Sequence, residues 1–232
     1  MCRIWPLTVE ICFAASAVLA QDLTKVDPKH ATVEFENDQV RVVRERYAPR
    51  EVTPTHEHPA RVSIWITDGR VKVTYPDGKT DESFWKAGQV SWGAPRGKHI
   101  GENAGDQPFE TLVVELKRAP VASDSAKNDP AFDPVKVDPG HVRVELENDR
   151  VRVLRVRLGP HEKIPLHEHP ARVVVSLTDT DLKVTSVNGE TESRRLKPGE
   201  ARWGTPTKHM AENLHDTPVE LIEVELKENP AR

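Results

Sequence analysis

Thiol chemistry is almost absent from this chain of 232 residues, which has two cysteines. Both of them, Cys2 and Cys12, lie close to the N-terminus. The segment around them has the pattern of a secretory signal, because Arg3 precedes an apolar run and Val18-Leu19-Ala20 before Gln21 fits a cleavage site. A mature chain would then contain no cysteine. This excludes disulfides and thiolate metal sites and leaves His, Asp and Glu as metal ligands.

Long apolar runs and a charge excess are also missing. The run within residues 1–20 is short for a spanning helix, which needs about 20 apolar residues. We therefore predict a cleaved signal peptide, a secreted or periplasmic protein and no membrane association after cleavage; an uncleaved anchor is the alternative. The net charge of −4 is spread along the chain and gives no electrostatic case for binding nucleic acid.

The chain contains two similar halves. Residues 30–49, HATVEFENDQVRVVRERYAP, match residues 141–160, HVRVELENDRVRVLRVRLGP. The offset is 111 as far as Gly97, which has no counterpart, and 110 after it. Roughly half of the aligned positions are identical, which indicates a gene duplication.

The repeat divides the chain into domains. We predict one domain over 27–120 and a second over 138–230. Between them, residues 121–137 are rich in Pro, Asp and Ser and have the composition of a linker.

The local pattern of each half is that of β-strands. Segments such as VEFENDQVRVVRERY alternate between apolar and polar residues and are rich in β-branched side chains. Pro-Asp-Gly at 76–78 and Asn-Gly at 188–189 are hairpin signals. The sequence therefore predicts an all-β fold with a small sandwich or barrel in each half, and the two halves can cover each other's edges.

Three histidine positions with motif-like spacing are retained in both halves and give six histidines in total, although roughly half of the aligned positions differ. His56 and His58 lie two apart on a predicted strand, so both side chains point to the same face. Imidazole is a common ligand of Zn, Cu, Fe and Ni. The sequence thus predicts one facial metal site in each half, with open coordination positions and with the ligands His56, His58, His99, His167, His169 and His209.

The spacing of these residues resembles the two motifs of the cupin superfamily. The first motif, Gly-x5-His-x-His-x3–4-Glu-x6-Gly, is matched in the first half by His56, His58 and Gly69. The second, Gly-x5-Pro-x-Gly-x2-His-x3-Asn, is matched with single-residue shifts by Gly88, Pro95, Gly97, His99 and Asn103. The second half has the corresponding residues His167, His169, Gly199, Pro206, His209 and Asn213.

The resemblance implies a bicupin, with two tandem jelly-roll-type β-barrels. It also implies one divalent transition metal in each domain, which the sequence does not narrow beyond Cu, Fe, Zn, Mn or Ni. The carboxylate ligand of the motif would fall on Val62 in the first half and on Val173 in the second. Each metal site would then have three histidines as its only protein ligands. We expect Asn103 and Asn213 to share a face with the third histidine and to hydrogen-bond around the metal site.

Other repeated residues are assigned structural roles. Arg61 and Arg172 lie an odd number of residues after the His-x-His pair, so we expect them to point away from the ligands and to pair with Glu57 and Glu168. Trp92 and Trp203 are interpreted as aromatic core residues, and His30 and His141 as surface residues.

Three functions remain open at this point. The first is a metal-dependent oxidoreductase, dioxygenase- or oxidase-like, acting on a small organic or carbohydrate substrate. The second is a non-redox sugar isomerase or lyase, which would need a base such as Glu45, whose counterpart is Val156. The third is a non-catalytic cupin that binds metal or ligand. The sequence leaves open whether the chain is an enzyme and whether it forms a homo-oligomer.

Overall fold

The computed structural model describes residues 21–117 and 129–227. Within these ranges the chain is built almost wholly of strands, with two single-turn helices, α1 (Leu23–Val26) and α2 (Pro134–Val137), and one 3₁₀ turn, η1 (Pro130–Phe132). No helix of this part of the chain is long and apolar enough to cross a membrane. The predicted signal segment 1–20 lies outside the described residues.

Each half of the chain folds into nine strands, as the alternating sequence predicts. The first half contains β1 (Ala31–Glu36), β2 (Val40–Tyr47), β3 (His56–His58), β4 (Arg61–Trp65), β5 (Gly69–Thr74), β6 (Thr80–Trp85), β7 (Val90–Gly93), β8 (Arg96–Asn103) and β9 (Phe109–Leu116). The second half contains β10 (Val142–Glu147), β11 (Val151–Leu158), β12 (Lys163–His169), β13 (Arg172–Ser176), β14 (Thr180–Ser186), β15 (Thr191–Leu196), β16 (Ala201–Gly204), β17 (Thr207–Asn213) and β18 (Val219–Leu226). The predicted all-β fold with one barrel per repeat is confirmed.

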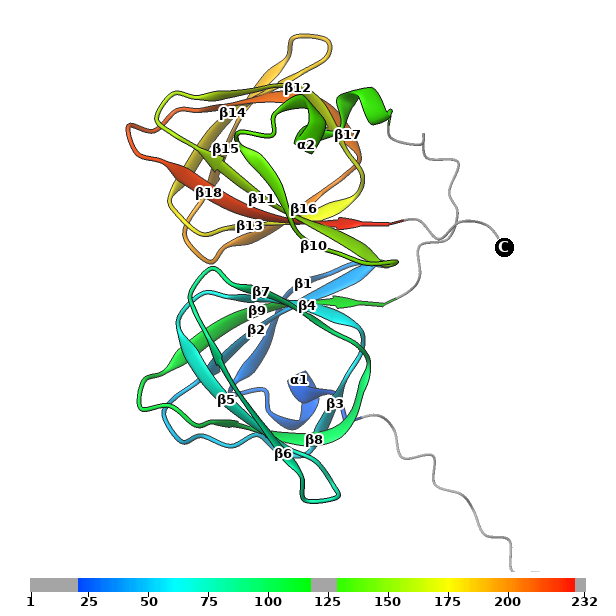
Figure 1. Cartoon of the computed structure of the whole chain (residues 1–232), viewed down its shortest axis with the longest axis vertical. Helices are drawn as coiled ribbons and strands as arrows, with labels where there is room; N and C mark the ends of the chain where they lie inside the picture. Colours follow the sequence, from blue (N-terminus) through cyan, green and yellow to red (C-terminus); the bar gives the residue numbers. More distant parts are fainter. Residues whose placement is uncertain (1–20, 118–128, 228–232) are drawn as a thin grey trace, which may run out of the picture.

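Each barrel consists of two antiparallel sheets. The first barrel has a five-stranded sheet in the order β1-β2-β9-β4-β7 and a four-stranded sheet in the order β3-β8-β5-β6. The second barrel repeats this arrangement with β10-β11-β18-β13-β16 and β12-β17-β14-β15. The five-stranded sheets lie face to face in the middle of the molecule, and the four-stranded sheets lie outside them (Figure 1).

The layer between the barrels is the main apolar core. Alternate residues of both five-stranded sheets meet there, among them Val42, Val62, Val114, Val153, Val173 and Val224. The polar contacts across this layer are reciprocal. Arg44 donates to the carbonyl of Gly199 at 2.6 Å, and Arg155, its counterpart, donates to the carbonyl of Gly88 at 2.5 Å. Such an exchange is expected when two similar surfaces pack about a pseudo-twofold axis.

The position of Val62 corrects the alignment with the cupin carboxylate. Val62 and Val173 are fully buried in the layer between the barrels, so they face away from the histidines. Strand β3 ends at His58 in one sheet and β4 begins in the other sheet, which means that residue parity does not carry across the corner. The next residues, Ser63 and Val174, line the barrel interiors instead.

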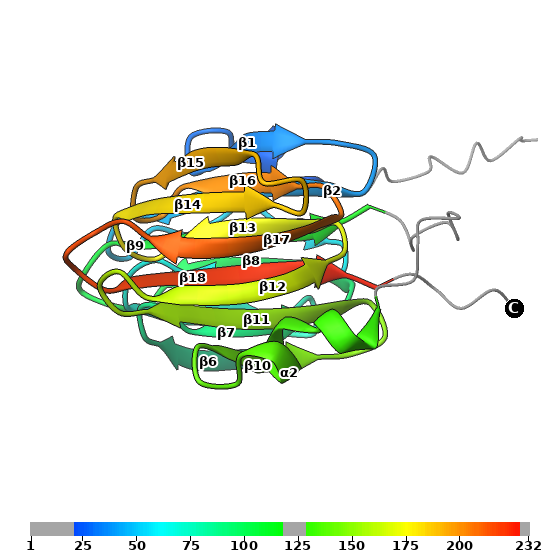
Figure 2. The ribbon, with the colours of Figure 1, turned by 90° about the horizontal axis from the view of Figure 1, so that it is seen from above.

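The short helices stand at equivalent places in the two halves. Residues 129–137, assigned to the linker by composition, form η1 and α2, and α2 packs against β10 and β12 (Figure 2). Its counterpart α1 packs against β1 and β3. Leu23 of α1 and Pro134 of α2 each line the cavity of their own barrel. A turn of helix therefore closes part of each interior.

The layer between the barrels yields a stability prediction. We expect Val62→Glu to lower the free energy of unfolding by about 3 kcal/mol or more, because it would bury an unpaired carboxylate among apolar side chains. Ser63→Glu is the matched control, since its side chain would face the polar cavity of the first barrel. Urea denaturation measures both variants, and equal losses would contradict the placement of Val62 between the barrels.

Candidate metal centres

Three buried imidazoles converge inside the first barrel. His56 and His58 come from β3, and His99 comes from its antiparallel neighbour β8, where it lies directly opposite His56. The Nε2 atoms of His56 and His58 are 3.0 Å apart, and one nitrogen from each of the three rings lies within 4.8 Å of the others. Neighbouring strands thus bring together the three histidines that the sequence singled out.

The second barrel repeats this group. His167 and His169 come from β12, His209 comes from β17, and His167 lies opposite His209. All three are buried, and their potential ligand atoms also fall within 4.8 Å of one another. The structure therefore gathers all six histidines into two groups, while their role as metal ligands stays a prediction.

Backbone carbonyls orient several of these rings. The Nδ1 atom of His56 lies 2.9 Å from the carbonyl of Pro54, that of His99 lies 2.9 Å from the carbonyl of Gly97, and that of His167 lies 2.7 Å from the carbonyl of Pro165. A carbonyl only accepts, so Nδ1 must carry the proton in each case. The lone pair is then on Nε2, which faces the other histidines.

The donor set fits a divalent transition metal. Burial lowers the pKa of His99 and of His167 to about 4, and that of His169 to about 3, so these rings are neutral at pH 7. Metal–imidazole bonds of about 2.1 Å at right angles place the two nitrogens about 3 Å apart, as His56 and His58 have them. Mg²⁺ and Ca²⁺ prefer oxygen ligands and fit this nitrogen set poorly.

The extra residue Gly97 changes the first site locally. In the second barrel His169 lies opposite Thr207, two residues before His209, whereas in the first barrel His58 lies opposite Arg96 because the register shifts at a bulge. Gly97 supplies the carbonyl that accepts from His99. The Nδ1 atom of His209 has no such partner in the described part of the chain.

Arg61 and Arg172 lie inside the barrels, and the prediction that they point away from the ligands is wrong. Both line the cavities that contain the histidines, because the parity count crossed the corner between β3 and β4. The guanidinium of Arg61 packs over Gly93, and that of Arg172 packs over Gly204. A side chain with a Cβ atom in place of either glycine would crowd the guanidinium. The Nη1 atom of each is buried without a hydrogen-bond partner among the described residues.

Asn103 and Asn213 hold loops and do not orient the histidines. The amide nitrogen of Asn103 donates to the carbonyls of Tyr47, Ala48 and Gln107, at 2.9 to 3.1 Å. Asn213 makes the equivalent bonds to Leu158, Gly159 and Thr217. Each side chain thus joins the ends of β2 and β8, or of β11 and β17, to the turn before the last strand, which is a stabilising role.

His30 is also more enclosed than its assignment to the surface implied. Its side chain is 13% exposed and lies between Asp27 and Glu51, with Nδ1–Oδ1 and Nε2–Oε2 distances of 2.8 and 3.0 Å. His141 lies in the same way between Asp138 and Glu162. Trp92 and Trp203 pack against the apolar layer between the barrels, as expected for core aromatics.

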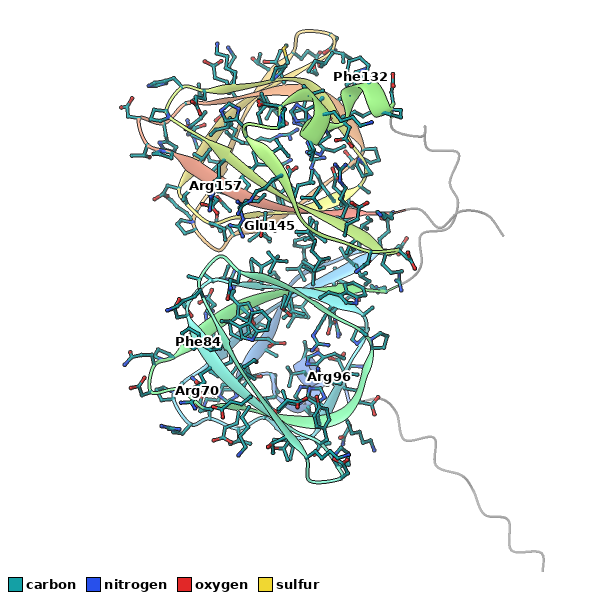
Figure 3. The ribbon with its side chains drawn as sticks, viewed as in Figure 1. Arg70, Phe84, Arg96, Phe132, Glu145 and Arg157 are labelled. Carbon is teal, nitrogen blue, oxygen red and sulfur yellow. The ribbon has the colours of Figure 1, made fainter. Side chains whose placement is uncertain are left out.

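The two cavities differ in size and in chemistry. The cavity of the first barrel measures about 120 Å³ and that of the second about 40 Å³. Five polar residues that line the first cavity have aliphatic counterparts in the lining of the second cavity. Glu45, Tyr47, Thr53, Ser63 and Thr111 correspond to Val156, Leu158, Ile164, Val174 and Leu221. Arg96 lies within the outline of the first barrel in Figure 3 and lines the same cavity.

Each cavity is lined by a glutamate that interacts with its arginine, but this glutamate stands at different positions in the two barrels. In the first barrel this is Glu45 of β2, whose pKa burial raises to about 7 against the opposing attraction of Arg61. In the second it is Glu223 of β18, which accepts from Arg172 at 3.2 Å. The structure therefore places Glu45, named from the sequence as a base, in the same cavity as the first histidine group.

Comparison with known proteins gives structural matches. No family model and no curated protein matches this chain. The structure of AerE from Microcystis aeruginosa aligns with a TM-score of 0.59 and 14% identity over 86% of this chain and 98% of that one. A mutant of Bacillus subtilis oxalate decarboxylase aligns with a TM-score of 0.57 and 14% identity over 83% of this chain and 70% of that one.

A further structure of that oxalate decarboxylase, whose description concerns its Mn(II) centres, aligns with a TM-score of 0.56 and 13% identity over 84% of this chain and 70% of that one. These low identities establish the architecture alone. Oxalate decarboxylase has the two-barrel bicupin architecture. The chain therefore has the tandem cupin fold, with one group of three histidines inside each barrel.

Proposed function

We propose that the protein is a metal-dependent oxidoreductase that acts on a small organic acid in its first barrel. The observation that carries this proposal is the first cavity itself. It combines three convergent imidazoles, room for a ligand and a buried guanidinium nitrogen of Arg61 that lacks a partner among the described residues. A carboxylate is the ligand group that best satisfies such a guanidinium.

The volume of the cavity supports a substrate of a few atoms. An apolar cavity of about 150 Å³ holds benzene, so about 120 Å³ suits a molecule of up to roughly six non-hydrogen atoms. This favours a short carboxylic acid over a carbohydrate. Oxalate decarboxylase, named among the structural neighbours, has a substrate of this class. The second cavity, about 40 Å³, is too small for such a ligand.

The residues of the first barrel have separate roles in this proposal. His56, His58 and His99 would hold the metal, which supplies a Lewis acid and, for copper, iron or manganese, a redox centre. Arg61 binds and orients the carboxylate of the substrate. The hydroxyl of Tyr47 lines the same cavity with no hydrogen-bond partner in the described residues, so it is available to a second polar group of the substrate.

Glu45 favours a second candidate function. A carboxyl group with a pKa near 7 can both accept and donate a proton close to neutral pH. Glu45 shares the cavity with the histidines and Arg61, so it can move a proton to or from an acid bound there. This supports a non-redox isomerase or lyase, in which the metal polarises the substrate and Glu45 transfers the proton.

The signal-like N-terminal segment supports a secreted or periplasmic location, which we retain as part of the proposal. Such a compartment also affects which metal is acquired, because availability decides among metals that imidazole accepts. A protein that binds metal and a small acid without turnover is the remaining alternative. It differs from the two enzymes in having no product.

The metal requirement gives the first prediction of this section. We expect about two metal ions per chain, one for each histidine group, because both donor sets are complete. The double substitution His56→Ala/His58→Ala should remove one of them. Elemental analysis after reconstitution with Cu, Zn, Fe, Mn and Ni in turn measures the stoichiometry. Values near zero with every metal would refute metal binding at these groups.

Turnover tests the proposed reaction. We expect the copper-, iron- or manganese-loaded protein to consume oxygen with a short carboxylic acid from a panel such as oxalate, glyoxylate and lactate. Arg61→Met should raise the KM for that acid by at least about tenfold, because a buried charged hydrogen bond to the substrate is lost. The exposed Arg70, which pairs with Glu82, provides the control substitution Arg70→Met.

The outcomes separate the candidate functions. No oxygen consumption, but solvent deuterium incorporation or carbon dioxide release, would replace the oxidoreductase with the proton-transfer enzyme. Binding of the acid without any product would leave the binding protein. An unchanged KM for Arg61→Met would contradict the assigned role of that arginine.

Glu45 gives a pH prediction for the metal-free protein. A carboxyl pKa raised from 4.5 to about 7 stabilises the fold below pH 4.5, and this contribution is lost as the pH rises through 7. We expect Glu45→Gln to become more stable than the parent over this range, by roughly 2 to 4 kcal/mol above pH 7. Urea denaturation from pH 4 to 8 measures this, with the exposed Glu82→Gln as control. A pH-independent difference would show that Glu45 titrates normally.

A further inference from the structure

A chain of four charged or polar residues leads to one histidine of each group. It starts at the aspartate that caps α1 or α2, passes through an arginine of β2 or β11 and a glutamate of β9 or β18, and ends at the second histidine of the His-x-His pair. The members are Asp22, Arg41, Glu115 and His58 in the first barrel, and Asp133, Arg152, Glu225 and His169 in the second. We call each set a relay.

The outer end of the relay is the same in both barrels. Asp22 accepts from Arg41 at 2.5 Å, and Asp133 accepts from Arg152 at 2.6 Å. Asp22 also accepts from the backbone N–H of Thr24 at the start of α1. The aspartate therefore fixes the arginine and the short helix together, and the difference between the barrels lies further in.

The inner end of the relay is connected differently in the two barrels. In the first, Arg41 donates to Glu115 at 2.6 Å, and the other oxygen of Glu115 is 3.5 Å from Nδ1 of His58, which has no hydrogen-bond partner among the described residues. In the second, Nδ1 of His169 lies 2.7 Å from Glu225, and Arg152 is 3.8 Å from that carboxylate. The glutamate is thus held by arginine in one barrel and by histidine in the other.

Two local differences accompany this exchange. The bulge at Gly97 shifts the register of β3 and β8 between His56 and His58, so that His58 lies opposite Arg96, whereas β12 and β17 pair regularly from His167 to His169. Glu223, where the first barrel has Val113, places a second carboxylate 3.4 Å from Nδ1 of His169. Both differences strengthen contact between histidine and carboxylate in the second barrel alone.

We propose that Arg41 and Arg152 are positioning residues that set the metal affinity of their barrel by competing with a histidine for a shared glutamate. A carboxylate that accepts from Nδ1 orients the imidazole and makes its Nε2 a stronger donor, and loss of such a partner changes metal affinity about 10- to 100-fold. The second barrel then has the tighter metal site. The inference rests on the proposed function in requiring that both histidine groups bind metal.

The first experiment compares the two sites in isolation. The background His167→Ala/His169→Ala leaves the first group, and His56→Ala/His58→Ala leaves the second. We expect cobalt(II), followed by its absorption in competition with a chelator, to bind the second group at least about tenfold more tightly. Affinities equal within about threefold would overturn this inference and leave the proposed function standing. Binding by neither protein would overturn both.

The second experiment tests the competition itself. In the background with the first group alone, Arg41→Met frees Glu115 to accept from His58, so cobalt should bind about tenfold more tightly. In Arg41→Met/Glu115→Gln this gain should vanish, because the carboxylate that transmits it is gone. A gain that survives in the double variant would mean that Arg41 acts only through its charge. A weakened site in Arg41→Met would also overturn the proposal.

Isosteric changes cover the case in which Arg41→Met fails to fold. In the background with the second group alone, Glu225→Gln should weaken cobalt binding at least tenfold, whereas Glu115→Gln in the other background should change it less than about threefold. The ¹⁵N shift of Nδ1 in the metal-free proteins gives an independent readout, with a hydrogen-bonded signal for His169 and none for His58. Equal effects of the two glutamine substitutions would overturn the inference.

Discussion

Removal of water from three imidazoles is the constraint on which the rest of each barrel depends. Burial keeps the rings neutral, so their lone pairs are free to bind a cation, but every buried Nδ1–H then needs an acceptor. The carbonyls of Pro54, Gly97 and Pro165 and the carboxylate of Glu225 meet this need for four of the six rings, whereas Nδ1 of His58 and of His209 has no hydrogen-bond partner among the described residues. Three of these acceptors come from the segment before β3, the bulge in β8 and strand β18.

The two barrels satisfy this constraint around different interiors. A carboxylate faces the cavity arginine from β2 in the first barrel and from β18 in the second, where it is bonded to Arg172. The first group lies in the larger cavity, and five polar residues of its lining have aliphatic counterparts in the smaller cavity of the second group. Duplicated histidines therefore do not imply duplicated chemistry. The first barrel has the larger cavity, and the second is closer to a packed core.

The sequence predicted those features that a period of two or an internal repeat determines. The strands and the six histidines follow from alternation and from their retention in both halves, whereas the difference between the two interiors was not predicted. The sequence did not predict that Arg61 points into the barrel and that Val62 points toward the other barrel. The chain passes from one sheet to the other between His58 and Arg61, so the alternation of side chains starts anew there. The relays were also missed, since their members are distant in sequence and meet only in the fold.

Alternation along β2, β4 and β9 separates two selective pressures that act on the same strands. Val42, Val62 and Val114 face the other barrel, while Glu45, Ser63 and Thr111 face the cavity. After the duplication, the outward set had to remain compatible with its copy, as the reciprocal bonds of Arg44 and Arg155 still record. The inward set was under no such restriction. A paired ancestor could thus change the interior of one half without losing the surface that joined the halves.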